Sequence, residues 1–169
     1  MIEHPASRSG GPVHRFQRWL YRYGHPNRTA RVMNRVSAVL FSTGLILPGR
    51  AATLEVIGRR TGRLISFPIA ITAYQGARYV VAMLGQETNW ARNVRAAGGR
   101  AVLRHGRREA VRLDEVDVRA RAPILRRYLA IAPGARSHVP LDRRAPLEEF
   151  ERVAARFPVF RVTPDPPIH

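Results

Sequence analysis

A short turn between two apolar segments carries the residues best suited to hold an anion. It reads Gly58-Arg59-Arg60-Thr61-Gly62. The glycines at its ends allow positive φ and a close approach to a ligand, and the amides between them can point in one direction and form an anion-binding concavity. The two arginines add fixed positive charge. We therefore predict a phosphate-binding turn, with an ordinary hairpin turn and solvated arginines as the alternative.

A second group of candidate residues follows in the segment Asn89-Trp90-Ala91-Arg92-Asn93. Trp90 and Asn93 are three residues apart, so they lie on one face of a helix. Such a pair has the composition of an aromatic clamp with a polar amide beside it. The alternative is that Trp90 packs in the core and that Asn93 is exposed or forms a local cap.

The charge of the chain also points to an anionic partner. All 29 basic residues are arginine and only 12 acidic residues oppose them, which gives a formal net charge of +17. A field of this strength favours an anionic ligand or surface. Nucleic acid fits the charge equally well. However, the aromatic residues are not grouped on one strand and no nucleic-acid-binding motif occurs, so we expect no specific nucleic-acid binding.

Missing residue types exclude several kinds of chemistry. Without lysine the chain cannot form a Schiff base, anchor pyridoxal phosphate or build a Walker A nucleotide site. Without cysteine it has no thiol nucleophile, disulfide or cysteine-bound zinc, and its histidines lack metal-ligand spacing. We therefore expect no metal site. The absence of cysteine also fits a cytoplasmic protein.

The chain is long enough for one compact domain with a hydrophobic core. Residues 1–12 predict a disordered lead without the apolar run of a secretory signal. Residues 13–47 predict two helices, of which the first is basic and amphipathic; the apolar part of the second is shorter than the roughly 20 residues that cross a bilayer. Either these helices pack on the domain, or they lie on an anionic membrane surface at the inner face of the cell membrane.

Residues 48–165 form the main domain, and their pattern predicts an α+β fold. Strand-like segments, rich in β-branched and aromatic residues, cover 53–57, 64–74, 78–84, 100–105, 108–115 and 157–162. Helical segments cover 88–97, 118–131 and 146–156. Gln75-Gly76 predicts a hairpin turn and Gly98-Gly99 a helix end. Pro68 cannot donate to a strand ladder, so it predicts an edge strand, a bulge or contact with a ligand.

Five segments in this order resemble the deazaflavin-dependent nitroreductase-like oxidoreductases, and the resemblance covers most of the chain. They are Arg18-Trp19-Leu20-Tyr21, Leu54 to Arg63 with Pro68 downstream, Tyr79-Val80-Val81, Asn89 to Val94, and Pro158-Val159-Phe160-Arg161-Val162. The resemblance implies a split β-barrel of about six to seven mostly antiparallel strands, with N-terminal amphipathic helices and flanking helices. It also implies binding of coenzyme F420, a deazaflavin with a phosphate and an acidic tail. Hydride would pass from the reduced cofactor to a small organic acceptor such as a quinone, a nitro compound or an activated alkene.

The resemblance also assigns residues to the cofactor. They are Gly58, Arg59, Arg60, Thr61, Gly62, Pro68, Ile69, Met83, Leu84, Gly85, Gln86, Trp90 and Asn93. The turn would hold the phosphate and tail, the proline and isoleucine would approach the ring, residues 83–86 would meet its edge with backbone groups, and the helix would wall the site and hydrogen-bond to it. Protonation of the acceptor would fall to solvent, to Tyr128 or to His138.

Two functional alternatives use the same fold. One is a cofactor-binding or lipid-binding split-barrel protein without turnover, held at the membrane surface by residues 13–47. The other is an enzyme that uses flavin mononucleotide (FMN) in place of F420. The sequence is compatible with a monomer and with a homodimer.

Overall fold

The computed structural model of the protein describes residues 50–165. The lead expected over 1–12 and the helices expected over 13–47 lie outside the described residues. The strands are β1 (Ala51–Ile57), β2 (Leu64–Ala70), β3 (Thr72–Tyr74), β4 (Ala77–Val81), β5 (Arg100–His105), β6 (Arg107–Glu115) and β7 (Val159–Pro164). The helices are α3 (Asn89–Ala96), α4 (Arg121–Ile131) and α5 (Leu147–Val153), with short 3-10 helices η1 (Val118–Ala120), η2 (Pro133–Ser137) and η3 (Ala154–Arg156).

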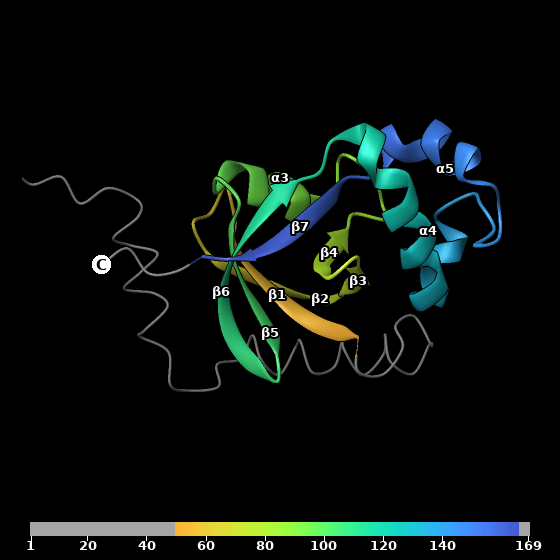
Figure 1. The fold of residues 1–169 in the computed structure, drawn as a ribbon. Helices are drawn as coiled ribbons and strands as arrows, with labels where there is room; N and C mark the ends of the chain where they lie inside the picture. The colour runs from red at the N-terminus through yellow and green to blue at the C-terminus, as the bar shows by residue number, and fades with distance from the viewer. Residues whose placement is uncertain (1–49, 166–169) are drawn as a thin grey trace, which may run out of the picture.

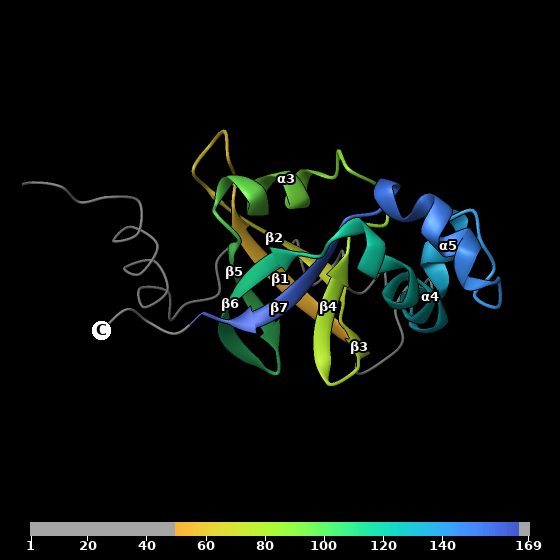
Figure 2. The ribbon, with the colours of Figure 1, turned by 45° about the horizontal axis from the view of Figure 1, so that its top comes forward.

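The seven strands form one sheet in the order β2-β1-β5-β6-β7-β4-β3, and every neighbouring pair is antiparallel. The sheet curls into a half-barrel, as Figure 1 shows. Helix α3 lies over one part of it, and α4 and α5 lie together at another side (Figure 2). The structure therefore confirms the predicted α+β split-barrel fold.

The two edges of the sheet meet where a single residue joins them. Strands β2 and β3 lie at opposite edges, yet only Ile71 separates them in the chain. Its N–H donates to the carbonyl of Arg50 at 2.9 Å. The prediction of one strand over 64–74 is therefore wrong, because the chain passes there from one edge of the sheet to the other. The edge position predicted for Pro68 is confirmed, since within residues 50–165 β2 pairs with β1 alone and Pro68 is opposite Thr53.

Two hydrophobic clusters form the core. The first fills the barrel, because alternate strand residues such as Leu54, Leu103 and Phe160 point inward, and α3 adds Ala91 and Val94. The second lies between the sheet and α4–α5, and its fully buried members include Leu125, Phe150 and Val159. No helix within residues 50–165 is long and apolar enough to cross a membrane.

Glycines end the elements that position the candidate site. Gln75 and Gly76 have φ values of 46° and 74°, which confirms the predicted hairpin between β3 and β4. Gly98 and Gly99 have φ values of 63° and 85° and end α3 as predicted. Strand β4 stops at Val81, earlier than predicted, because the following residues turn. The N–H of Gly85 donates to the carbonyl of Ala82 at 3.0 Å in this turn.

Candidate functional site

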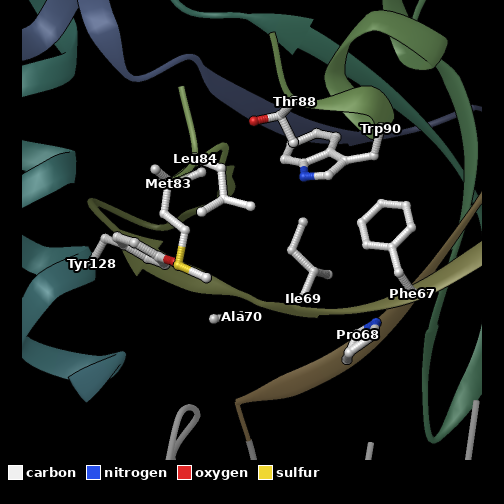
Figure 3. A pocket seen from close by; sticks show the side chains of 10 residues that line it. Phe67, Pro68, Ile69, Ala70, Met83, Leu84, Thr88, Trp90 and Tyr128 are labelled. Carbon is white, nitrogen blue, oxygen red and sulfur yellow. The ribbon is translucent and has the colours of Figure 1, made fainter. Parts of the chain in front are cut away.

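A pocket of about 170 Å³ lies between β2, residues 82–88, α3 and α4 (Figure 3). Its lining residues are Phe67, Pro68, Ile69, Ala70, Val81, Met83, Leu84, Thr88, Trp90 and Tyr128. The pocket lies where the two core clusters meet, since Ile69 belongs to the barrel cluster and Tyr128 to the helical one. Because its walls are mostly apolar and aromatic, it suits a flat, weakly polar ring better than a charged group.

Strand β2 supplies one wall by simple alternation. Phe67 and Ile69 are two residues apart, so both point to the barrel side of the strand, where Phe67 is opposite Leu54. Figure 3 shows both side chains directed toward the cavity, with Pro68 between them on the other side of the strand. Phe67 is not among the residues predicted from the sequence to bind the cofactor, although its spacing from Ile69 inside a predicted strand indicates a shared face.

Trp90 lines the pocket beside Phe67 and is fixed by two aromatic neighbours. Its ring stacks with Phe67 at a centroid distance of 5.8 Å and an interplanar angle of 28°. It also contacts Phe160 at 5.4 Å with a tilt of 54°. Trp90 therefore belongs to the packing of the barrel and also lines the pocket. Contacts on two sides leave the indole little rotational freedom, so the wall exists before any ligand binds.

Among the described residues, three polar side chains line the pocket. The Thr88 hydroxyl is occupied, because it donates to the carbonyl of Gly85 at 2.6 Å. The indole N–H of Trp90, which lies on the cavity side of its ring in Figure 3, and the hydroxyl of Tyr128 make no hydrogen bond with residues 50–165. Burial raises the pKa of Tyr128 far above its ordinary value. Its phenol therefore stays protonated and can donate, and it cannot serve as a base at neutral pH.

The arginine turn is closed by its own backbone. Gly58 N–H donates to the carbonyl of Arg63 and Gly62 N–H to the carbonyl of Gly58, both at 2.8 Å. Gly62 has a φ of 64°. Within the described residues, the amides of Arg60 and Thr61 make no hydrogen bond. The concavity predicted from the sequence is thus reduced to two amides at the exposed tip of the turn.

Helix α3 fixes the turn through Arg59. The Asn93 side-chain oxygen accepts from the backbone N–H of Arg59 at 3.2 Å and from its guanidinium at 2.8 Å. A longer contact of 3.5 Å joins the guanidinium to the side-chain oxygen of Asn89. Asn93 is only 2% exposed. Asn93 therefore holds the turn and does not line the pocket beside Trp90.

The predicted ring-edge residues separate into two groups. Met83 and Leu84 line the pocket, whereas Gly85 and Gln86 do not. The side chain of Gln86 donates to the carbonyl of Ala155 at 2.6 Å and accepts from Arg95 at 2.8 Å. These bonds tie the loop to neighbouring elements from outside the cavity.

A charged network supports the same loop. Arg95 also binds Glu115 at 2.8 Å, and Glu115 accepts from the buried Arg121 at 3.1 Å. The hydrogen bond from Arg95 lowers the pKa of Glu115. This network joins α3, β6 and α4 behind the residues that line the pocket, and no motif in the sequence indicated it.

Two further expectations concern histidine and metals. His138 is exposed after η2 and is not among the residues that line the pocket. Among residues 50–165, no three histidine, cysteine, aspartate or glutamate side chains are close enough to hold a metal ion. Tyr128 is therefore the one of the two proposed proton donors that the structure brings to the pocket.

Comparisons with known proteins give structural matches at low sequence identity. No family model matches the chain, and no curated protein matches its sequence. A protein of unknown function from Agrobacterium tumefaciens is 18% identical with a TM-score of 0.50, over 77% of this chain and 54% of its own. An F420-H2 dependent reductase is 17% identical with a TM-score of 0.47, over 70% of this chain and 97% of its own. A heme-binding protein from Mycobacterium smegmatis is 11% identical with a TM-score of 0.46, over 83% of this chain and 52% of its own. Similarity at this level concerns the fold alone.

Proposed function

We propose that this protein is an oxidoreductase that binds coenzyme F420 and transfers hydride from its reduced form to a small organic acceptor. The observation that carries the proposal is the position of α3, which joins an aromatic pocket to the arginine turn of residues 58–62. Trp90 lines the pocket, and one turn further along the same helix Asn93 holds the backbone and guanidinium of Arg59. A ligand with a flat ring and an acidic tail needs these two surfaces side by side.

The chemistry of the side chains fits both parts of the cofactor. No carboxylate forms an ion pair with Arg59, Arg60 or Arg63 within the described residues. Arg60 and Arg63 are exposed, and all three guanidinium groups keep their charge for a phosphate or carboxylate. Trp90 and Phe67 present aromatic surface to the pocket, and the Trp90 indole and Tyr128 hydroxyl offer donors to a ring carbonyl or to the acceptor.

The protein's part in the reaction is to bind, orient and exclude water. The bound cofactor supplies the hydride. The aromatic wall fixes the plane of a ring placed against it, and the apolar lining keeps bulk water away from the reacting carbon. Tyr128, which stays protonated, can hold a hydrogen bond to an acceptor oxygen as charge develops there. Hydride transfer needs no protein nucleophile.

Titration of the purified chain with F420 and, separately, with FMN tests the proposal through tryptophan fluorescence. Oxidation of reduced F420 is then followed after adding a quinone or nitro compound. The matched variants are Arg60→Gln with Arg63→Gln, and Arg126→Gln as an exposed control on α4 that lines neither the pocket nor the turn. The double variant should weaken F420 binding by about tenfold or more, because each charged hydrogen bond contributes roughly 1.5–3 kcal/mol.

Each result has a distinct meaning. Saturable F420 binding that weakens in the double variant, followed by oxidation of reduced F420, supports the proposal. Tight binding without turnover would favour the non-catalytic alternative, and preferential binding of FMN would favour a flavin enzyme of the same fold. Equal binding by the wild type and the double variant would show that the turn does not hold the acidic tail.

Attachment to anionic vesicles through residues 13–47 is a separate proposal, tested by sedimentation with and without those residues.

A further inference from the structure

A second cleft, of about 460 Å³, lies between the β3–β4 hairpin, β7, η1, the first turn of α4, and α5. It shares no lining residue with the pocket described above. Figure 2 shows the β3–β4 hairpin and α4 as neighbouring elements. The base of the cleft is apolar, with Val116 and the 3%-exposed Ile124 among its lining residues.

Two tyrosines give the cleft an aromatic wall. In the β3–β4 hairpin, Tyr79 is opposite Thr72 and Tyr74 is opposite Ala77. Residues opposite one another share a face, and so do residues two apart, so both tyrosine rings lie on one face of the hairpin. Both rings are partly buried and pack against the helical cluster. Their remaining exposed surface lines the cleft.

Two arginines place positive charge at the same wall. Arg161 is opposite Tyr79 in the β4–β7 ladder, and Arg119 lies on η1. Within residues 50–165, neither guanidinium forms an ion pair with a carboxylate. The carboxylate nearest to Arg161 in register, that of Asp114, is engaged by Arg112 at 3.0 Å and by Thr163 at 3.2 Å.

The balance of charge selects a class of ligand. Glu151 is the one acidic side chain among the described residues that line the cleft. Two guanidinium groups and one carboxylate leave a net charge of +1. We propose that this cleft binds a small organic monoanion with an aromatic body, its ring against Tyr74 and Tyr79 and its anionic group at Arg119 and Arg161. This site is independent of the cofactor proposed above.

The proposal is tested with the full chain by amide NMR and one probe, 3-phenylpropionate. Its matched neutral control is 3-phenylpropanamide, which has the same ring and no charge. We expect saturable shifts of the amides of Gln75, Val116 and Ala120, which border the cleft, and no comparable shifts at Met83 or Trp90. The control 3-phenylpropanamide should bind about tenfold more weakly than 3-phenylpropionate, because it cannot form a charged pair with a guanidinium group.

Variants separate the cleft from unspecific binding. Arg119→Gln with Arg161→Gln should reduce the affinity for 3-phenylpropionate by about tenfold or more, while Arg126→Gln should leave it unchanged. Both replaced arginines are exposed, so the spectra of the double variant should keep the dispersion of the folded protein. Each of four results would overturn the proposal. The shifts could centre on Met83 and Trp90, or the backbone amides of the cleft could fail to shift at millimolar 3-phenylpropionate. The affinity for 3-phenylpropanamide could equal that for 3-phenylpropionate, or the double variant could bind 3-phenylpropionate as tightly as the wild type.

Discussion

Replacement of Asn93 by alanine tests whether α3 holds the arginine turn. The substitution removes one oxygen that accepts two hydrogen bonds from Arg59, at 3.2 Å and 2.8 Å. The bond from the guanidinium is charge-assisted and contributes about 1.5–3 kcal/mol, and the bond from the backbone about 0.5–1.5 kcal/mol. Because the Arg59 side chain is only partly buried, water replaces part of the first. We expect the free energy of unfolding to fall by about 2–3 kcal/mol.

The measurement is urea unfolding followed by tryptophan fluorescence, with midpoint and slope fitted together. Binding of F420 is measured on the same samples under conditions where the variant is folded. The turn should also bind the acidic tail less tightly, because its backbone is no longer held against the helix before the ligand arrives.

Asn93→Asp is the matched control for this prediction. Aspartate keeps an oxygen where both Arg59 donors need it, so stability should fall less than in the alanine variant. However, its negative charge partly neutralises the turn, so F420 binding should still weaken. If Asn93→Ala unfolded at the wild-type urea midpoint and bound F420 normally, the hydrogen bonds between Asn93 and Arg59 would have no energetic role, which would refute the prediction.

Three other predictions concern the pocket, the network and the turn. Tyr128→Phe should lower the rate of hydride transfer. Because burial raises the pKa of Tyr128, the wild-type rate should not change with pH near the ordinary tyrosine pKa of about 10. A change of the wild-type rate near pH 10 that is absent in Tyr128→Phe would contradict this. The pKa of Glu115 is lowered from 4.5, mainly by the hydrogen bond from Arg95. A lowered folded pKa gives stability that is present above pH 4.5 and lost as the pH falls through the folded value, so Glu115→Gln should flatten the dependence of the urea midpoint on pH below 4.5. Gly62→Ala should lower the free energy of unfolding by about 1–2 kcal/mol, because Gly62 has a φ of 64° that alanine adopts only with strain. The added Cβ itself meets no atom within 4 Å. An unchanged urea midpoint would mean that the turn rearranges freely.

The fold was largely predictable because its signals are local. Alternating β-branched residues gave the strands, and Gln75-Gly76 and Gly98-Gly99 gave the turns. The passage of the chain through Ile71 from one sheet edge to the other was not predictable, because both flanking segments have strand composition. Only the closure of the barrel, a property of the whole sheet, distinguishes one long strand from two short ones.

The site was predictable in its parts and not in how they connect. Spacing predicted that Trp90 and Asn93 share a helix face, which was interpreted as one shared ligand site. In the structure the two side chains serve adjacent surfaces, the pocket and the turn. Sequence spacing along α3 cannot give this division, because it depends on how far residues 58–62 fold over the helix.

The choice of partner for each arginine separates structural cations from those available to a ligand. Arg78 is held by Glu109 at 2.7 Å in a neutral pair, and Arg95 and Arg121 share the carboxylate of Glu115 at 2.8 Å and 3.1 Å. Arg59 is held instead by the neutral side chain of Asn93. An amide oxygen fixes the direction of a guanidinium and leaves its charge uncancelled, whereas a carboxylate would cancel it. The first turn of α3, beside Arg59, also contains no acidic residue, so the positive end of the helix adds to the same field. The use of asparagine at this position therefore supports a turn whose positive charge is kept for an anion.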